Sequence, residues 1–476
     1  MTDSLLRRKD IVPKQAEGQG LARTLSWPHL VALGVGAIVG TGILTLIGVG
    51  AAKAGPAVIL SFAIAGLICI CAALAYAEMA TMIPASGSAY TYSYVVIGEL
   101  VAWVIGWSLI LEYSLVVSTV AVGWSGYASP LLKSWMSFPD WLTHAPVLAG
   151  HLSDGTLAVA RAGINLPAVF IIFVVAGLLI AGTRESATLN ATLVLVKIAA
   201  LIVFVVVALP HFDAANLDPF MPNGFPKSGL PGQEVGVMAA AAIIFFAFYG
   251  FDAIATAAEE TKNPGRDLSI GIVGSMLICV LIYVAVGVTA VGALNYTRLA
   301  GSDEPLAFIL REIGQPGAAR YLGLSAVIAL PTVILAFFYG QSRIFFTMAR
   351  DGMLPARLAK LSQRGAPTRI TLFTAIVVSV LAACIPLDEL AALANAGTLA
   401  AFTAVTVCML IMRQRAPDAP RTFRAPLPWL IGVVAIGGCL YLFYSLPAKT
   451  QLWFGIWNLA GLAVYFLYAR RNAIVA

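Results

Sequence analysis

The stretch GVGAIVGTG, residues 34–42, decides how the chain folds, because it places four glycines within nine residues of an apolar segment. A glycine inside a helix destabilises it by up to about 1 kcal/mol relative to alanine. We therefore expect a helix that unwinds near residues 39–42. Closely spaced small residues also let two membrane helices pack tightly, so the glycines alone leave both interpretations open. A nucleotide-binding loop is excluded, since no strand precedes the stretch and no lysine follows it.

The composition predicts a membrane protein. Of the 476 residues, 60% are hydrophobic and 11% are charged, whereas about 25% of a soluble protein is charged. A soluble globular protein and a disordered chain are both excluded, because disorder needs low hydrophobicity and high charge. Backbone that unwinds inside a bilayer needs a cavity or a ligand to bind its N–H and C=O groups. The half-helix after the break would direct its N–H groups at an anion such as a carboxylate.

Apolar segments of about 20 residues are candidates for helices that cross a bilayer, and the sequence contains twelve of them. Turn signals such as Asn263-Pro264-Gly265 separate neighbouring segments. The twelve segments are 27–52, 56–81, 99–129, 166–183, 185–210, 234–261, 268–294, 320–348, 368–386, 393–412, 428–446 and 452–469.

The distribution of Lys and Arg supports this count. With the N-terminus in the cytoplasm, the inside segments hold 20 of the 29 cations and the outside segments hold 8. Cytoplasmic loops of membrane proteins show this excess of positive charge. The formal net charge of +6 therefore reflects the cations that set the orientation of the chain in the membrane. We expect no nucleic-acid partner. The one remaining cation, Lys197, lies within a predicted span.

A second interrupted helix is predicted in the sixth span. The sequence FFAFYGFD, residues 245–252, places a glycine and an acid in the middle of an apolar helix. Residues 27–210 and 234–412 then form two halves of five spans, and each half begins with an interrupted helix. Because five is odd, the second half is inverted relative to the first, which is typical of secondary transporters. We expect the substrate site where residues 38–43 and 246–252 meet.

Three ionisable residues lie far from any predicted membrane surface, namely Glu112, Lys197 and Asp252. Ionisable groups at such depth are costly and usually face a cavity or a partner. They either neutralise one another as buried ion pairs, or at least one of them titrates during a transport cycle, because burial disfavours the charged form. The sequence leaves both possibilities open.

Four motifs in the same order resemble the amino acid–polyamine–organocation superfamily, in its cationic amino acid transporter branch. The first is GAIVGTGI at residues 36–43, which is similar to the first-helix signature of that superfamily. The others are LILEY at 109–113 followed by GWSGY at 123–127, FFAFYGFDAIATAAEETKNP at 245–264, and RIFFTMARDGMLP at 343–355. Together with the span count, they extend the resemblance to nearly the whole chain.

The resemblance implies an all-α polytopic membrane protein with twelve transmembrane helices. Two inverted five-helix repeats would form the core, with helices 1 and 6 discontinuous, and the last two helices would be peripheral. It also implies substrate-binding roles around the two breaks. The residues concerned are Ile38, Gly40, Thr41, Gly42, Phe246, Phe248 and Tyr249.

Within this set, the resemblance implies that the amides of Thr41 and Gly42 hold a substrate carboxylate. The carbonyl groups of Ile38, Phe246 and Tyr249 would take the ammonium group. Either Phe246 or Phe248 would close over the side chain. Tyr249 is bulkier and more polar than the aliphatic residue that is common in the family, so the size of the pocket stays open.

Lys197 matches a fifth-span lysine whose ammonium group, in proton-coupled members, resembles a substitute for the sodium ion of sodium-coupled relatives. We therefore predict a secondary transporter that takes up cationic or small neutral L-amino acids with protons, by alternating access. Lys197 would alternate between its charged and neutral forms, helped by Glu112, and Asp252 is a further candidate. If Glu112 instead pairs with Lys197, it is not free to bind a cationic side chain, and small neutral substrates are favoured.

An exchanger of amino acids or amines on the same fold remains open. A membrane enzyme is disfavoured, because the four histidines lie near span ends or in loops and leave a buried haem or metal site without its usual ligands. A channel would need a continuous polar lining, which three isolated charges do not supply. We expect no cofactor and no metal; the partners are an amino acid substrate, protons and the lipid bilayer.

The predicted organisation has five parts. Residues 1–26 form a cytoplasmic tail, 27–210 the first repeat, 234–412 the second repeat, 428–469 helices 11 and 12, and 470–476 a cytoplasmic C-terminus. We expect a multi-pass protein of the plasma membrane, or of the inner membrane in a cell that has one.

Overall fold

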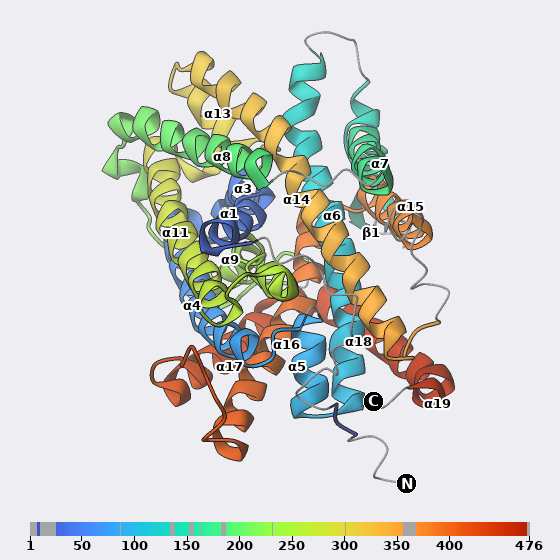
Figure 1. The fold of residues 1–476 in the computed structure, drawn as a ribbon. Helices are drawn as coiled ribbons and strands as arrows, with labels where there is room; N and C mark the ends of the chain where they lie inside the picture. Colours follow the sequence, from blue (N-terminus) through green and yellow to red (C-terminus); the bar gives the residue numbers. More distant parts are fainter. Residues whose placement is uncertain are drawn as a thin grey trace.

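The computed structural model describes residues 7–9, 25–85, 87–133, 139–151, 157–161, 163–181, 187–230, 232–299, 301–355 and 368–473. This part of the chain is mostly helical (Figure 1). Two short antiparallel strands, β1 (Val147–His151) and β2 (Leu157–Arg161), form a hairpin between the third and fourth predicted spans. Most of the predicted tail, 1–26, and residues 474–476 lie outside the described residues.

The helices follow the predicted order, with additional short ones between them. They are α1 (Trp27–Ile38), α2 (Thr41–Leu44), α3 (Leu46–Ala54), α4 (Val58–Met82), α5 (Ser88–Val96), α6 (Glu99–Lys133), α7 (Leu166–Ala181), α8 (Ala187–Ala208), α9 (Val237–Ile244), α10 (Asp252–Thr256), α11 (Pro264–Ala293), α12 (Tyr296–Leu299), α13 (Pro305–Glu312), α14 (Pro316–Arg350), α15 (Thr368–Cys384), α16 (Leu387–Arg415), α17 (Pro428–Ser445), α18 (Ala448–Val464) and α19 (Arg470–Asn472).

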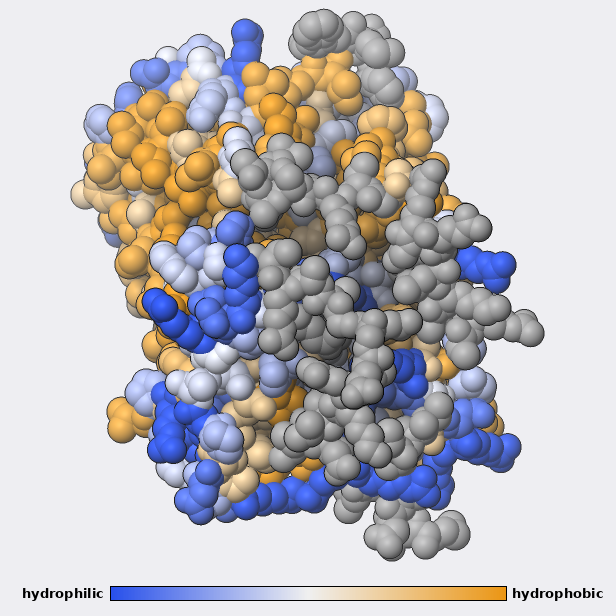
Figure 2. Space-filling view, in the orientation of Figure 1, coloured by the Kyte–Doolittle hydropathy of each residue, from blue (hydrophilic) through white to orange (hydrophobic). Residues whose placement is uncertain are grey.

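Many of these helices suit a bilayer. Within the described residues, nine are long and apolar enough to cross a membrane, and Trp27–Ile38, Leu166–Ala181 and Thr368–Cys384 are shorter apolar helices. Large apolar side chains on α8, α15, α17 and α18 are exposed. Figure 2 shows hydrophobic side chains over the upper flank of the molecule and hydrophilic ones gathered mainly toward its lower end. The multi-pass character is as predicted, whereas the number of crossings stays a prediction.

The two interrupted spans lie at the centre of the molecule (Figure 1). The α1 helix packs against α8, α11 and α14, and α9 packs against α3, α4 and α16. The hydrophobic window of the stretch Val237–Thr256 is entirely buried. Other helices shield these elements from lipid. The N–H and C=O groups that a helix break leaves free can therefore form hydrogen bonds with neighbouring parts of the protein.

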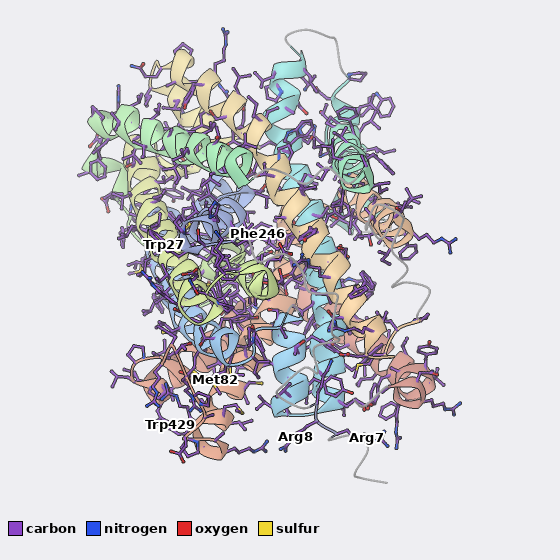
Figure 3. All side chains as sticks on the ribbon, in the orientation of Figure 1. Arg7, Arg8, Trp27, Met82, Phe246 and Trp429 are labelled. Atoms are coloured by element: carbon purple, nitrogen blue, oxygen red, sulfur yellow. The ribbon has the colours of Figure 1, made fainter. Side chains whose placement is uncertain are left out.

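The N-terminal segment and the last helices lie at one end of the molecule (Figure 3). The amide of Glu99, at the start of α6, donates to the carbonyl of Arg7. The carboxylate of Glu99 accepts from the hydroxyl of Tyr465, in the π-helical turn that follows α18. Lys9 forms an ion pair of 2.7 Å with Asp351 after α14. Residues from both ends of the chain therefore contact the same end of the molecule, where α6 begins and α14 ends.

Candidate functional site

The first span is broken after Ile38. Val39 is extended, Gly40 has φ −147° and ψ −149°, and α2 begins at Thr41. The interruption is shorter than the predicted 39–42, because Thr41 and Gly42 already belong to α2. A Cβ atom added to Gly42 would lie 2.3 Å from Cα of Ala247. The chain therefore needs glycine at position 42 because the sixth span approaches its backbone.

The sixth span is broken in a matching place. The α9 helix ends at Ile244 and continues as the 3₁₀ turn η5 (Phe245–Ala247), and α10 begins at Asp252. Gly250 lies between them with φ +120°, a conformation that L-residues rarely adopt. A Cβ atom at Gly250 would lie 2.9 Å from the carbonyl carbon of Ala37. The two breaks thus contact each other directly, backbone to backbone.

A small cavity lies between the two breaks. Six of the seven residues assigned to substrate binding from the sequence contribute to its lining: Ile38, Gly40, Thr41, Gly42, Phe246 and Tyr249. Phe246 is labelled at the centre of the molecule in Figure 3. The seventh, Phe248, is not among the lining residues. Its ring packs against Phe62 and Tyr283, with centroid distances of 6.1 and 5.2 Å.

The rest of the lining comes from α1, α6 and α14, and the sequence analysis did not identify it. The residues are Ala37, Val116, Val120, Val333 and Phe337. Apolar residues in apolar helices give no local signal that distinguishes a cavity wall from a lipid-facing side. Their selection depends on how α6 and α14 pack across the breaks. The resulting walls are predominantly apolar.

Lys197 is buried and contacts the first broken span. Its ammonium group donates to the carbonyl of Gly36, at 2.8 Å, and to the hydroxyl of Thr332 in α14, at 3.1 Å. It thereby links α1 to α14. The nearby carbonyl of Ile38, predicted to face a substrate ammonium group, accepts a hydrogen bond of 2.8 Å from the hydroxyl of Tyr283 in α11.

Glu112 lies apart from Lys197. Both of its carboxylate oxygens are buried, and the hydroxyl of Thr398 in α16 is the side-chain group that interacts with them. The backbone of Gly397 in α16 faces its Cβ atom, and Asp252 is close enough to interact electrostatically. The possibility of a direct Glu112–Lys197 ion pair, which the sequence left open, is therefore not realised in this structure.

Asp252 starts the second half of the sixth span. One oxygen of its carboxylate accepts from the amide of Gly250, at 3.0 Å, and the other accepts from the hydroxyl of Tyr113, at 3.0 Å. The first bond holds the turn at Gly250 against the start of α10, and the second joins α10 to α6. Asp252 therefore fixes α10 to α6 and does not line the cavity.

Tyr249 places a polar group next to the cavity. Its hydroxyl is buried and has no hydrogen-bond partner in the described part of the chain. Glu112 and Asp252 are its closest charged neighbours. An unpaired hydroxyl in a buried position costs about 1–3 kcal/mol, so a ligand group that bonds it would gain that amount.

In the same described residues, no group of three His, Cys, Asp or Glu side chains is arranged to hold a metal ion.

Comparison with known proteins identifies the family. The family model described as "Amino acid permease" matches residues 25–467, which include both broken spans and every residue of the cavity lining. The chain belongs to the amino acid permease family. The superfamily resemblance inferred from the four motifs is thereby confirmed.

The permease is similar to curated transporters over nearly its whole length. It is 41% identical to the branched-chain amino acid permease BcaP of Bacillus subtilis (strain 168), with 99% of each chain covered. It is 40% identical to the methylthioribose transporter of the same organism, again over 99% of each chain. Cationic amino acid transporter 2, vacuolar, of Arabidopsis thaliana is 38% identical over 89% of the permease and 65% of the relative. These relatives are transporters and not enzymes, as the sequence predicted.

Proposed function

We propose that the permease takes up a neutral aliphatic L-amino acid together with a proton, by alternating access across the plasma membrane. Its frame would be two inverted five-helix repeats and two peripheral helices, with both ends in the cytoplasm. The observation that carries the proposal is the contact of Lys197 with Gly36 and Thr332. An ammonium group that loses its proton holds a carbonyl less strongly, because hydrogen bonds of charged donors are about twice as strong as neutral ones. Proton release would therefore loosen α1 from α14.

The cavity supports the substrate class. Its walls are formed mainly by aliphatic and aromatic side chains, which favour an apolar side chain. The first N–H groups of α2, from Thr41 and Gly42, would bind the carboxylate, because they precede the first intrahelical bonds. The carbonyls of Ile38, Phe246 and Tyr249 would bind the ammonium group. Ile38 retains a second lone pair beside its bond from Tyr283. The branched-chain permease relatives are consistent with this class.

A cationic substrate is the second candidate. Glu112 is buried near enough to Tyr249 to interact with it electrostatically, and within the described residues it forms no ion pair with a Lys or Arg side chain. A buried carboxylate without a cationic partner is costly, and a substrate cation that reached it would offset that cost. The similarity to cationic amino acid transporters is consistent with this alternative.

Uptake into proteoliposomes tests the proposal. L-leucine, L-alanine and L-arginine are offered under an imposed pH gradient, with and without sodium, to liposomes that contain no amino acid. We expect the gradient to drive net uptake of L-leucine without sodium, and Lys197→Met to abolish the dependence on the gradient. Lys449→Met is the matched control, because Lys449 is exposed and pairs with Glu389.

Four outcomes would contradict part of the proposal. Uptake that ignores the pH gradient, or that survives Lys197→Met unchanged, excludes proton coupling through Lys197. Uptake that requires a preloaded amino acid identifies an exchanger. If L-arginine is taken up in place of L-leucine, the cationic candidate replaces the neutral one.

A further inference from the structure

The two helices that would end the proposed repeats, α8 and α16, occupy corresponding positions. The α8 helix packs against α1 and α14, and α16 packs against α9 and α6. If the repeats are inverted copies, α1 corresponds to α9 and α14 to α6, so the two sets of contacts are the same. This correspondence rests on the repeat organisation that belongs to the proposed function.

Each of these helices also carries one polar side chain that donates to the end of a broken span. Lys197 of α8 donates to Gly36, and Asn395 of α16 donates through Nδ2 to Ala242 at 2.7 Å and to Ile243 at 3.0 Å. Gly36 is among the last four residues of α1, and Ala242 and Ile243 are among the last four of α9. The last four carbonyls of a helix lack intrahelical donors. Both side chains therefore bond carbonyl groups at the end of a helix, where the carbonyl of Ile243 also accepts from the amide of Phe245.

The orientation of the Asn395 amide follows from its neighbours. Both atoms that face it across the contact are carbonyl oxygens, so the NH₂ group must point toward α9. Asn395 is fully buried, and its Oδ1 has no hydrogen-bond partner in the part of the chain that the structure describes. An unbonded oxygen of this kind costs about 1–3 kcal/mol. An apolar side chain would avoid that cost but would remove the side-chain donor from the carbonyls of Ala242 and Ile243.

We propose that Asn395 is the non-titratable counterpart of Lys197, a positioning residue that holds the end of α9 throughout the transport cycle. An amide does not ionise, whereas an ammonium group can lose its proton. Proton release then frees the first span alone, while Phe246, which follows α9, stays in place as a wall of the cavity. The two repeats are therefore coupled to the proton asymmetrically, because Lys197 can lose its charge and Asn395 carries none.

Two substitutions at one position test this role. Asn395→Ala removes the donor, and we expect the KM for L-leucine uptake to rise about tenfold, the effect of leaving buried acceptors unpaired, with an unchanged dependence of uptake on pH. Asn395→Asp should behave differently. Its protonated carboxyl group can donate to a carbonyl, so uptake should approach that of the wild type at acidic pH. The ionised carboxylate faces two carbonyl oxygens, so uptake should be lost at alkaline pH.

Asn458→Ala is the matched control. Asn458 is a partly buried asparagine on α18 that donates to the carbonyl of Phe454, away from both breaks. Its loss should leave the KM and the pH profile unchanged. The proposal is overturned if Asn395→Ala keeps the wild-type KM, or if Asn395→Asp responds to pH as Asn395→Ala does. Should Asn395→Ala fail to fold, Asn395→Asp purified at acidic pH carries the test.

A second measurement separates this proposal from the proposed function. The midpoint of thermal unfolding in detergent requires no substrate. Relative to the wild type, Asn395→Asp should lose stability as pH rises, because only its protonated form donates to α9. If the wild type takes up none of the three amino acids, the proposed function fails. The unfolding profile of Asn395→Asp then still supports or overturns the positioning role.

Discussion

At the scale of single residues, two glycines allow the broken spans to touch. Gly42 lies against Ala247, and Gly250, with its positive φ, lies against Ala37. Any side chain at either position would separate the two breaks and displace the groups around the cavity. Gly42 is needed for the close approach alone, whereas Gly250 is needed for the close approach and for its positive φ.

We predict that Gly42→Ala abolishes transport. The added methyl group would lie 2.3 Å from Cα of Ala247, and since backbone atoms block it, the first and sixth spans must move apart. Initial uptake rates in proteoliposomes measure the effect. Gly177→Ala is the control, because no atom lies within 4 Å of a Cβ at that position in α7. Equal rates for the two variants would show that the contact does not matter for the site.

At the scale of elements, α18 is fastened to α6 by tryptophans. Trp107 donates to the carbonyl of Trp457, at 2.9 Å, and Trp457 donates back to the carbonyl of Trp107, at 3.0 Å. Their rings stack with centroids 4.9 Å apart. Trp103 donates to the carbonyl of Gly461, where the helices are closest. In the proposed arrangement, these tryptophan contacts hold a peripheral helix to the core. They do not involve the residues that line the cavity.

Gly461→Leu should therefore lower stability without changing substrate affinity. A Cβ atom at Gly461 would lie 2.4 Å from the ring of Trp107, and overpacking of this kind costs about 1–3 kcal/mol. The thermal unfolding midpoint and the KM are measured together. Gly455→Leu, on the same helix with no atom within 4 Å, is the matched control. A raised KM with an unchanged midpoint would contradict the assignment of α18 as a support.

At the scale of the whole molecule, hydrogen bonds join the broken spans to α6 and α14 on either side of the cavity. Toward one end, Tyr127 of α6 donates to the carbonyl of Leu44, at 2.6 Å. Toward the other, Arg343 of α14 donates to the carbonyl of Thr256, at 3.0 Å, and forms an ion pair with Glu260. The second set joins the end of the sixth span to α14. If the protein opens toward that end, which the charge distribution predicts to be cytoplasmic, these contacts must break.

Arg343→Gln should favour opening toward this end. Charge-assisted hydrogen bonds contribute about 1.5–3 kcal/mol each, so we expect a cysteine placed at Thr256 to react about tenfold faster with an impermeant thiol reagent in inside-out vesicles. The rate is compared with that of Thr256→Cys alone. Arg320→Gln, at the opposite end of α14, should leave it unchanged. A rate that does not respond to Arg343→Gln would show that this contact does not hold the end closed.

Part of the site could be predicted because its signals are local. Composition within windows of about 20 residues indicates a membrane helix, and glycines at 40 and 250 indicate where such a helix breaks. The charges of Lys197, Glu112 and Asp252 stand out for the same reason. The cavity walls at Val116 and Val333 have no comparable signal, since similar apolar sequences occur throughout the chain. The short helices α5, α12 and α13 are too short to stand out in windows of that length.

The sequence by itself determined that the chain crosses a membrane, near which residues its first and sixth spans break, and which three charged side chains are buried. Each of these properties depends on residues that are close together in the sequence. Only the tertiary structure decided which groups bond the broken ends: Tyr283 reaches Ile38 across 245 residues of sequence, and Asn395 reaches Ala242 across 153. It also turned Phe248 away from the cavity and separated Glu112 from Lys197. Hydrogen bonds form between groups that packing brings together, and a single sequence does not record that packing at such separations.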